Sequence, residues 1–234
     1  GRKLKAPLQN CKRRMFVTDF FGRASPLPGL GVPLPRYLTA FPVIKENSFL
    51  GYSIPPRQIT SAKEAKAQGV IWGKEVKHMK MAAAVIMAVA DVAIVHLTVK
   101  MEVVSHPNIV YRGMLTGDEW HALLAESRFL VGLGDPLAGP SAVDAVAAGC
   151  VYVNPVYAKQ AGGRGIVGGY SSQHPYLADA FGPPRVCSYR EKDAAGAASC
   201  VRQALSTELE PFVPPDFTEK AYMARVRRIF ADYL

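Results

Sequence analysis

The chain has 234 residues, enough for one large domain or two small ones with a sizeable core. Hydrophobic residues make up 49% of it and charged residues 20%, which excludes an intrinsically disordered or collagen-like protein. Most of the net charge of +9 lies in residues 1–36, where eight lysines and arginines accompany one acidic residue, Asp19. Pro and Gly between Ser25 and Pro35 favour a solvated linker. A nucleic-acid-binding arm is the alternative, but interleaved aromatic residues are lacking, so we expect no nucleic acid partner.

The chain begins with Gly1 rather than methionine, so we expect a processed product or a piece of a longer protein. Its first residues show no signal-peptide pattern. One apolar stretch, Met81–Val99, has nearly the length of a membrane span but carries Asp91 at its middle. A central Asp costs about 2.5–3.5 kcal/mol in a bilayer, so we predict a buried helix followed by a buried strand instead.

The four cysteines show neither CxxC spacing nor a nearby pair of histidines. We therefore predict no zinc site and no other bound metal. The spacing leaves open whether any two of the cysteines form a disulfide. They are Cys11, Cys150, Cys187 and Cys200.

After residue 36, short apolar runs alternate with segments of helical periodicity, as a parallel sheet with covering helices requires. The runs are continuously hydrophobic, which is typical of strands covered on both faces. The predicted strands are Phe49–Ile54, Val70–Gly73, Val92–Val99, Asn108–Tyr111, Phe129–Leu133, Val151–Asn154 and Arg185–Tyr189. The predicted helices are Glu75–Ala90, Gly117–Glu126, Ser141–Ala148, Lys192–Leu205 and Glu219–Tyr233. Thr116 is the expected N-cap of the helix that follows it, and Gly149 the expected glycine after Ser141–Ala148.

These elements predict an α/β fold, a Rossmann-like doubly wound parallel sheet, over residues 37–213. Residues 1–36 are the basic tail or interdomain linker, and residues 214–234 hold a separate C-terminal helix. In an open sheet of this kind ligands bind beyond the carboxyl ends of the strands. The candidate site is therefore expected in the loops that lead from strand to helix.

The loop best suited to a ligand leads from the strand Phe129–Leu133 to the helix Ser141–Ala148. Its glycines permit close approach to the backbone, and the free N–H groups at the start of the helix would hold a phosphate. A purely structural turn is an equally good interpretation, because only part of a dinucleotide fingerprint is present. The candidate binding residues are Gly132, Leu133, Gly134, Gly139, Pro140 and Ser141.

Two charged residues near this loop are further candidates. Asp144 lies one turn into the helix, where its carboxylate could accept hydrogen bonds from two ribose hydroxyls. A surface aspartate favoured by the helix dipole is the alternative. Lys74 follows a predicted strand and could reach a phosphate or simply cover the start of a helix. We interpret Trp72 as a core residue and Trp120 as surface packing.

Three polar residues follow later strands. Asn154, with the proline after it, closes the strand Val151–Asn154. Gln173 and His174 belong to a polar loop, Ser171–Tyr176. For His174, which precedes a proline, a structural hydrogen-bonding role is favoured over that of a general base.

Several motifs in chain order resemble glycosyltransferase family 18, the alpha-1,6-mannosylglycoprotein 6-beta-N-acetylglucosaminyltransferases. The central one is VGLGDPLAGPSAVDAVAAGCVYVNP, from Val131 to Pro155. The resemblance covers the chain from about Tyr37 to its end. Its other motifs are Asn47–Tyr52, Tyr111–Leu115, Ser172–Tyr176 and Glu210–Thr218.

The resemblance implies the C-terminal, donor-binding half of a GT-B enzyme, in which two Rossmann-like domains face each other. Members of the family transfer N-acetylglucosamine from UDP-GlcNAc to a mannose 6-hydroxyl of an N-glycan on a glycoprotein, with inversion and without a metal or cofactor. The implied location is the Golgi lumen, with a membrane anchor outside this chain. The acceptor domain and its catalytic base belong to the N-terminal half, so we name no catalytic residue here.

The candidate donor-binding residues of this chain match the family only in part. Asp144 stands where the family has a glutamate expected to bind ribose, and Lys74 and Arg112 are candidates to add positive charge near the diphosphate. Ala138 replaces a glutamate and Val156 a lysine, both expected to address the donor. The two losses could each cost about 1–3 kcal/mol of binding, or compensate each other as a lost charge pair. A non-catalytic binding or scaffold domain is therefore the alternative function.

Overall fold

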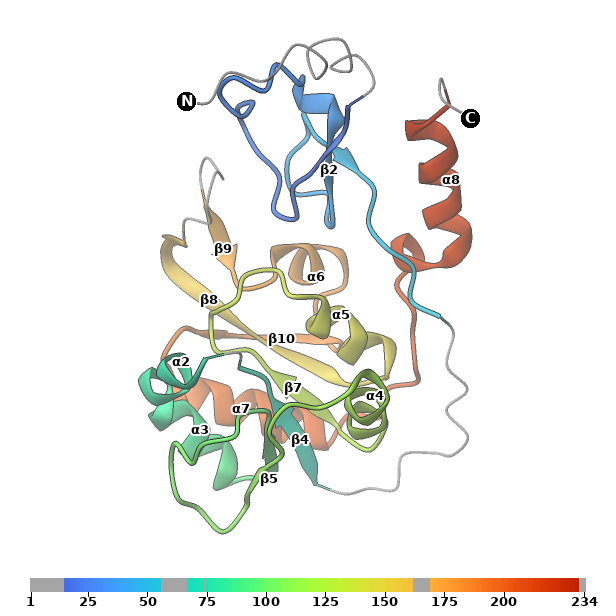
Figure 1. Cartoon of the computed structure of the whole chain (residues 1–234). Helices are drawn as coiled ribbons and strands as arrows, with labels where there is room; N and C mark the ends of the chain where they lie inside the picture. The colour runs from blue at the N-terminus through green and yellow to red at the C-terminus, as the bar shows by residue number, and fades with distance from the viewer. Residues whose placement is uncertain (1–14, 56–66, 74, 162–168, 232–234) are drawn as a thin grey trace. The chain divides into compact units, whose positions relative to one another are not determined.

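The computed structural model describes residues 15–55, 67–73, 75–161 and 169–231 (Figure 1). They form two compact units. Unit 1 contains the described residues of 1–55 and 215–234 together with Gly169, and unit 2 contains those of 56–161 and 170–214. The domain boundaries predicted from the sequence lie after residues 36 and 213. In the structure, the chain passes from unit 1 to unit 2 after residue 55 and returns to unit 1 after residue 214.

Unit 2 is built on a sheet whose parallel strands have the spatial order β6-β5-β4-β7-β8-β10. Counted along the chain this is the 3-2-1-4-5-6 order of a Rossmann fold, so the predicted doubly wound sheet is confirmed. A further strand, β9, pairs with β8 in the antiparallel direction. The strands are β4 (Gln68–Ile71), β5 (Ile94–Leu97), β6 (Ile109–Tyr111), β7 (Phe129–Val131), β8 (Val151–Ala161), β9 (Tyr170–Ser172) and β10 (Val186–Arg190).

The helices of unit 2 pack in pairs, α3 against α7 and α4 against α5. The predicted helix Glu75–Ala90 is divided at Ala82, whose φ of −102° and ψ of 14° depart from helical values. The predicted helices over 117–126, 141–148 and 192–205 are confirmed, with ends shifted by at most two residues. The helices are α2 (Val76–Met81), α3 (Ala83–Ala90), α4 (Gly117–Ala125), α5 (Pro140–Ala147), α6 (Pro175–Ala180) and α7 (Ala194–Leu205).

Both predicted helix ends are confirmed. The Thr116 side chain accepts a hydrogen bond from the Glu119 N–H, while the Glu119 carboxylate accepts from the Thr116 N–H. This capping box fixes the start of α4. Gly149 follows α5 with φ of +76°, and a Cβ there would lie 2.6 Å from the carbonyl oxygen of Leu209. Glycine is therefore required at this turn for both its conformation and its size.

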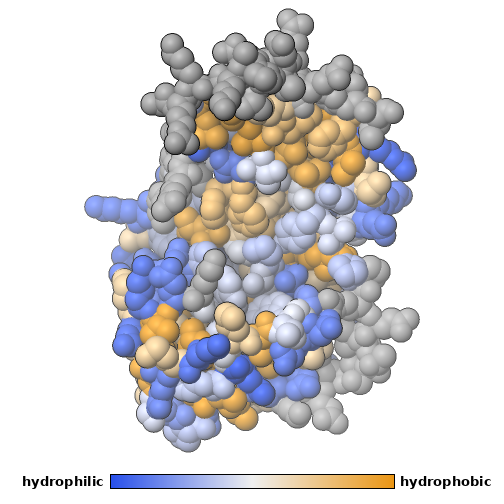
Figure 2. Space-filling model, viewed as in Figure 1, coloured by the Kyte–Doolittle hydropathy of each residue, from blue (hydrophilic) through white to orange (hydrophobic). Residues whose placement is uncertain are grey.

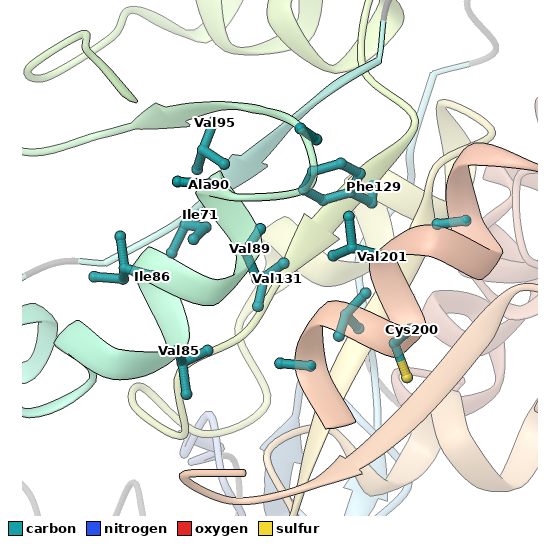
Figure 3. Packing of buried hydrophobic residues seen from close by; sticks show 14 of the residues in the cluster. Ile71, Val85, Ile86, Val89, Ala90, Val95, Phe129, Val131, Cys200 and Val201 are labelled. Carbon is teal, nitrogen blue, oxygen red and sulfur yellow. The ribbon is translucent and has the colours of Figure 1, made fainter. Parts of the chain in front are cut away.

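The core of unit 2 lies between the sheet and the α3–α7 pair. Figure 3 shows side chains from β4, α3, β5, β7 and α7 meeting there, among them Ile86 and Val201. The Phe129 ring occupies the space above Gly69, where a Cβ would come within 2.4 Å of the ring. The continuous apolar strands are thus explained by burial against helices, as predicted.

The apolar stretch Met81–Val99 contains all of α3, a turn and β5, which confirms the predicted helix followed by a strand. Among the described residues, none of the helices has both the length and the apolar character needed to cross a membrane. Hydrophilic and hydrophobic residues are interspersed on the face of unit 2 shown in Figure 2.

The cysteines have distinct environments. Cys187 on β10 and Cys200 on α7 form a disulfide, with a Cα–Cα distance of 5.7 Å. Cys150 is buried, and its thiol donates to the carbonyl of Ser127. Cys11 lies outside the described residues. In the described part of the chain no three His, Cys, Asp or Glu side chains are grouped so that they could hold a metal ion.

Three local predictions are wrong. The predicted strand Phe49–Ile54 ends at Phe49, because Gly51 has φ of +68° and cannot continue an extended strand. Asn154 does not close its strand: β8 continues to Ala161, since β10 and β9 pair with its later part. The polar loop over residues 171–176 instead contains the end of β9 and the start of α6.

Unit 1 combines a small parallel sheet of order β1-β2-β3 with α8 (Glu219–Ile229). Its strands are β1 (Val17–Thr18), β2 (Tyr37–Thr39) and β3 (Ser48–Phe49), and short 3-10 helices span Leu34–Arg36 and Pro215–Phe217. The predicted helix Glu219–Tyr233 is confirmed as far as Ile229; residues 232–234 lie outside the described residues. The segment between Ser25 and Pro35, expected to be a solvated linker, is partly buried: Val32 is 1% exposed.

Arg225 holds the two chain segments of unit 1 together. Its Nε donates to the carbonyl of Leu50 (2.8 Å), and its Nη2 donates to the carbonyl of Asp216. The guanidinium lies over the Phe49 ring, 4.3 Å from the centroid. Beside it, Phe217 is fully buried and packs against Phe49 and other aromatic rings. These contacts offset the cost of burying an arginine, whose side chain is always charged.

Candidate functional site

The candidate residues over 132–141 follow the carboxyl end of β7, beside β4, where the strand order reverses. Ile71 at the end of β4 lies in register with Val131 at the end of β7, so the loops that follow them start side by side. Open α/β sheets bind ligands in this crevice. Lys74, predicted to follow the first of these strands, lies outside the described residues.

The loop over residues 132–139 is held by Gln173, which is 4% exposed. Its Oε1 accepts a hydrogen bond from the Gly134 N–H (2.9 Å), and its Nε2 donates to the carbonyl of Pro136 (2.9 Å). Its backbone carbonyl accepts from the Ala138 N–H (2.7 Å). Gln173 therefore fixes the shape of the loop, while its predicted contact with a ligand stays a prediction.

Gly132 has no room for a side chain. A Cβ there would lie 2.1 Å from Gln173 Oε1 and 2.7 Å from the Tyr152 hydroxyl. The Gly132 carbonyl accepts a hydrogen bond from the Tyr189 hydroxyl (2.7 Å). Gly134, with φ of +97°, has its carbonyl bonded by the Tyr157 hydroxyl (2.6 Å). These glycines are needed for the packing of the loop, whether or not a phosphate approaches it.

The start of α5 has the form that an anion requires. Gly139 is the N-cap and Pro140 the first helical residue, and no side chain caps the helix. Pro140 has no N–H and the Ala142 N–H donates to the Gly139 carbonyl (3.2 Å), so the Ser141 N–H is the first-turn donor that points beyond the helix end, where the helix dipole favours negative charge. The hollow between Ser141, Trp72 and the loop measures only about 10 Å³, so a diphosphate would lie over the helix end rather than inside the hollow.

Asp144 contacts the neighbouring helix. Its Oδ2 accepts a hydrogen bond from Trp120 Nε1 of α4 at 3.4 Å. Both side chains are half-buried. Trp120 is thus more than the surface packing residue that the sequence predicts, because its polar edge meets the carboxylate. The predicted ribose contact of Asp144 stays a prediction.

Asn154 and His174 form a buried support behind the loop. The Asn154 side-chain oxygen accepts from the His174 N–H (3.1 Å), and His174 Nδ1 accepts from the Leu177 N–H at the start of α6. Burial lowers the pKa of His174 to about 3, so the ring is neutral. Because Nδ1 accepts, the ring proton is on Nε2. These hydrogen bonds support the predicted structural role of His174. Direct contact of Asn154 or His174 with the sugar nucleotide stays a prediction.

A second hollow of about 220 Å³ lies beside the loop. It is lined by the end of α2, the start of α3 and the residues that follow β7 and β10. His78 on α2 and Asp135 in the loop approach each other at its edge, with 2.8 Å between Nδ1 and Oδ2. Leu133, predicted to contact the sugar-nucleotide donor, and Glu191 also line this hollow.

The remaining charged and substituted positions are placed as follows. Arg112, expected near a diphosphate, follows β6, which is two strands away from β4 in the sheet. Its Nε donates to His96 Nδ1 (3.0 Å). Ala138 is 2% exposed with φ of +46°, and Val156 is 37% exposed. Neither of these two side chains brings charge to the loop.

Two buried histidines predict that unit 2 is less stable in acid. Burial, with a smaller contribution from the Arg112 guanidinium, lowers the pKa of His96 to about 4, and that of His174 is about 3. An unfolded histidine has a pKa near 6.5 and so binds a proton at pH 5, whereas the folded ones do not. Stability is therefore lost as the pH falls from about 6.5 towards 4, and the urea midpoint should be lower at pH 5 than at pH 7.

Tryptophan fluorescence measures this transition, because Trp72 and Trp120 are the two tryptophans of the chain and both belong to unit 2. His96→Gln removes one of the titrating groups, so the difference between the two midpoints should shrink in that variant. Equal midpoints at pH 5 and pH 7 in the unaltered chain would contradict the prediction.

The family model described as glycosyltransferase family 18 matches residues 15–232. The chain belongs to this family. The resemblance of the loop motifs is thereby confirmed. The human alpha-1,6-mannosylglycoprotein 6-beta-N-acetylglucosaminyltransferase A is 28% identical over 207 residues, which cover 82% of this chain and 28% of that protein. The mouse B enzyme is 23% identical (82% and 26% covered), and the Caenorhabditis elegans enzyme 26% identical (88% and 33% covered).

The chain spans about a third or less of the length of these relatives. Among solved structures, a glycosyltransferase of kitacinnamycin matches with a TM-score of 0.42 and 14% identity, covering 84% of this chain and 51% of that one. AviGT4 of avilamycin A biosynthesis matches with a TM-score of 0.42 and 16% identity, covering 97% and 76%. The Rossmann fold of this family 18 chain is assigned from its own strand order and not from these structures.

Proposed function

We propose that unit 2 binds the donor of an N-acetylglucosaminyltransferase, which transfers N-acetylglucosamine from UDP-GlcNAc to a mannose 6-hydroxyl of an N-glycan. The observation that carries the proposal is the family match over residues 15–232. The site geometry agrees with it, because a glycine-containing loop at the point where the strand order reverses leads into α5, a helix without a side-chain cap. The two-domain GT-B arrangement, inversion, independence of metals and cofactors, and residence in the Golgi lumen belong to the same proposal.

In this proposal the chain binds and stabilises the nucleotide. The Ser141 N–H at the start of α5 donates to the diphosphate and continues to do so as negative charge develops on the departing UDP. The three hydrogen bonds between Gln173 and the loop fix the segment that leads into α5, and a donor that is held in place beforehand need not reorganise during the reaction. Asp144 binds the ribose hydroxyls, and Lys74 is the proposed cation near the phosphates.

The acceptor sugar and the base that removes its hydroxyl proton are assigned to a domain beyond this chain. An inverting transfer needs a carboxylate that accepts the proton while UDP departs from the opposite face. We nominate no such base here, and transfer activity is proposed for the whole protein only.

Calorimetric titration of the 234-residue chain tests the proposal. UDP and UDP-GlcNAc should release heat with similar affinity, and a GDP-sugar should bind more weakly. The same titration with EDTA should give the same affinity. Absence of uridine-dependent heat at millimolar ligand would overturn the proposed function.

Asp144→Asn is expected to weaken UDP binding about tenfold. The carboxylate offers two oxygens that accept hydroxyl hydrogen bonds, whereas the amide offers one such oxygen and an NH₂ group that cannot accept. Hydrogen bonds to a charged group contribute about 1.5–3 kcal/mol. Asp118→Asn, the same change at an exposed position in the first turn of α4, is the control and should leave UDP affinity unchanged.

A scaffold domain is the second candidate, and the uncharged Ala138 and Val156 favour it. Restoring both charges by Ala138→Glu with Val156→Lys separates the two functions. A large gain in UDP-GlcNAc affinity would identify a disabled site, whereas unchanged or lower affinity supports a site that has adapted to the present residues. Since Ala138 is buried and its N–H is bound to Gln173, the urea midpoint of the double variant must be measured alongside.

A further inference from the structure

Two side chains of adjacent helices meet at the edge of the sheet where the proposed nucleotide lies. Trp120 is one turn into α4 and Asp144 one turn into α5. Both helices follow parallel strands, β6 and β7, so both begin at the carboxyl edge of the sheet. The indole N–H of Trp120 reaches Asp144 Oδ2 at 3.4 Å.

We propose that Trp120 is a positioning residue that orients the Asp144 carboxylate towards the ribose of the nucleotide and thereby sets the preference for a ribonucleotide over a 2′-deoxynucleotide. The inference rests on the proposed function, because it concerns how the same site recognises its donor.

The chemistry of the two groups supports this role. An indole N–H is a donor only, and a carboxylate has about four lone-pair directions, so the bond from Trp120 takes up one of them and does not prevent the carboxylate from accepting hydroxyl donors. A carboxylate that is already oriented loses less conformational freedom when the ribose binds. The need is greater for Asp144 than for a longer glutamate, since the shorter side chain has fewer positions from which it can reach two hydroxyls.

The arrangement also explains why a half-buried tryptophan lies at this point of α4. A packing role alone would be served equally by phenylalanine or leucine, whose side chains lack the N–H. Loss of the indole N–H should change the ratio of the affinities for UDP and 2′-deoxy-UDP. A loss of packing alone should leave this ratio unchanged.

The experiment is a double-mutant cycle on the 234-residue chain, with Trp120→Phe, Asp144→Asn and both together, titrated with UDP and 2′-deoxy-UDP. We expect Trp120→Phe to weaken UDP binding about three- to tenfold, because a net hydrogen bond contributes about 0.5–1.5 kcal/mol, and to weaken 2′-deoxy-UDP binding less, because that nucleotide keeps only one of the two hydroxyls. The double variant should bind UDP no more weakly than Asp144→Asn alone, since the tryptophan acts through the aspartate.

Equal loss for both nucleotides, no loss for either, or additive effects in the double variant would each overturn the positioning role while the proposed function stands. Absence of UDP binding by the unaltered chain overturns both. As a check that needs no stable variant, the Trp120 indole N–H signal in NMR spectra of the unaltered chain should shift more with UDP than with 2′-deoxy-UDP. Equal shifts would count against the inference.

Discussion

Gly132→Ala should weaken UDP binding at least about tenfold and destabilise unit 2 by about 1–3 kcal/mol. The added methyl would lie 2.1 Å from Gln173 Oε1 and 2.7 Å from the Tyr152 hydroxyl. To make room, Gln173 must move away from the Gly134 N–H and the Pro136 carbonyl, which it now holds. The loop would then lose the shape that presents the start of α5 to the diphosphate.

Gly117→Ala is the matched control, because a Cβ at Gly117 meets no atom within 4 Å. Both variants are titrated with UDP, and their urea midpoints are followed by tryptophan fluorescence. If Gly132→Ala bound UDP as well as the unaltered chain, the pinned loop would have no part in donor binding.

Arg225→Ala should destabilise unit 1 by about 2–4 kcal/mol. The change removes two charge-assisted hydrogen bonds, to the carbonyls of Leu50 and Asp216, and the stacking on Phe49. The Leu50 N–H, which donates to the Thr39 carbonyl, should exchange its hydrogen one to three orders of magnitude faster.

Hydrogen exchange measured by mass spectrometry on peptides over residues 37–52 tests this. Arg227→Ala, on the same helix but exposed, is the control and should leave the exchange unchanged. Exchange in Arg225→Ala equal to that of the control would show that the aromatic packing around Phe217 is sufficient by itself.

The Rossmann-like sheet of unit 2 could be predicted because its strands are buried on both faces and therefore read as continuous apolar runs. Thr116 and Gly149 marked helix ends through local chemistry, which a sequence displays directly. Unit 1 could not be predicted in the same way. Its strands are two or three residues long, and Arg225 is buried there only because distant carbonyls and a ring surround it.

For the candidate site, the sequence indicated the loop and the helix start, since glycines followed by a proline at the first helical position are local signals. It could not indicate that Gln173 holds this loop or that Trp120 meets Asp144. Both are contacts between residues at least 24 positions apart, made after the strands have paired. A glutamine in a polar segment carries no signal of such a role.

The hydrogen bond from Arg225 to Leu50 joins residues 175 positions apart, and it has a consequence for synthesis on the ribosome. Residues 15–55 are synthesised before α8 and cannot complete unit 1 until α8 has been made. Unit 2 lies between them in the chain and can collapse while that N-terminal segment still waits for its partner. A nascent chain arrested before residue 215 should therefore hold a folded unit 2 and an unfinished unit 1, in which β1 to β3 are open to chaperones.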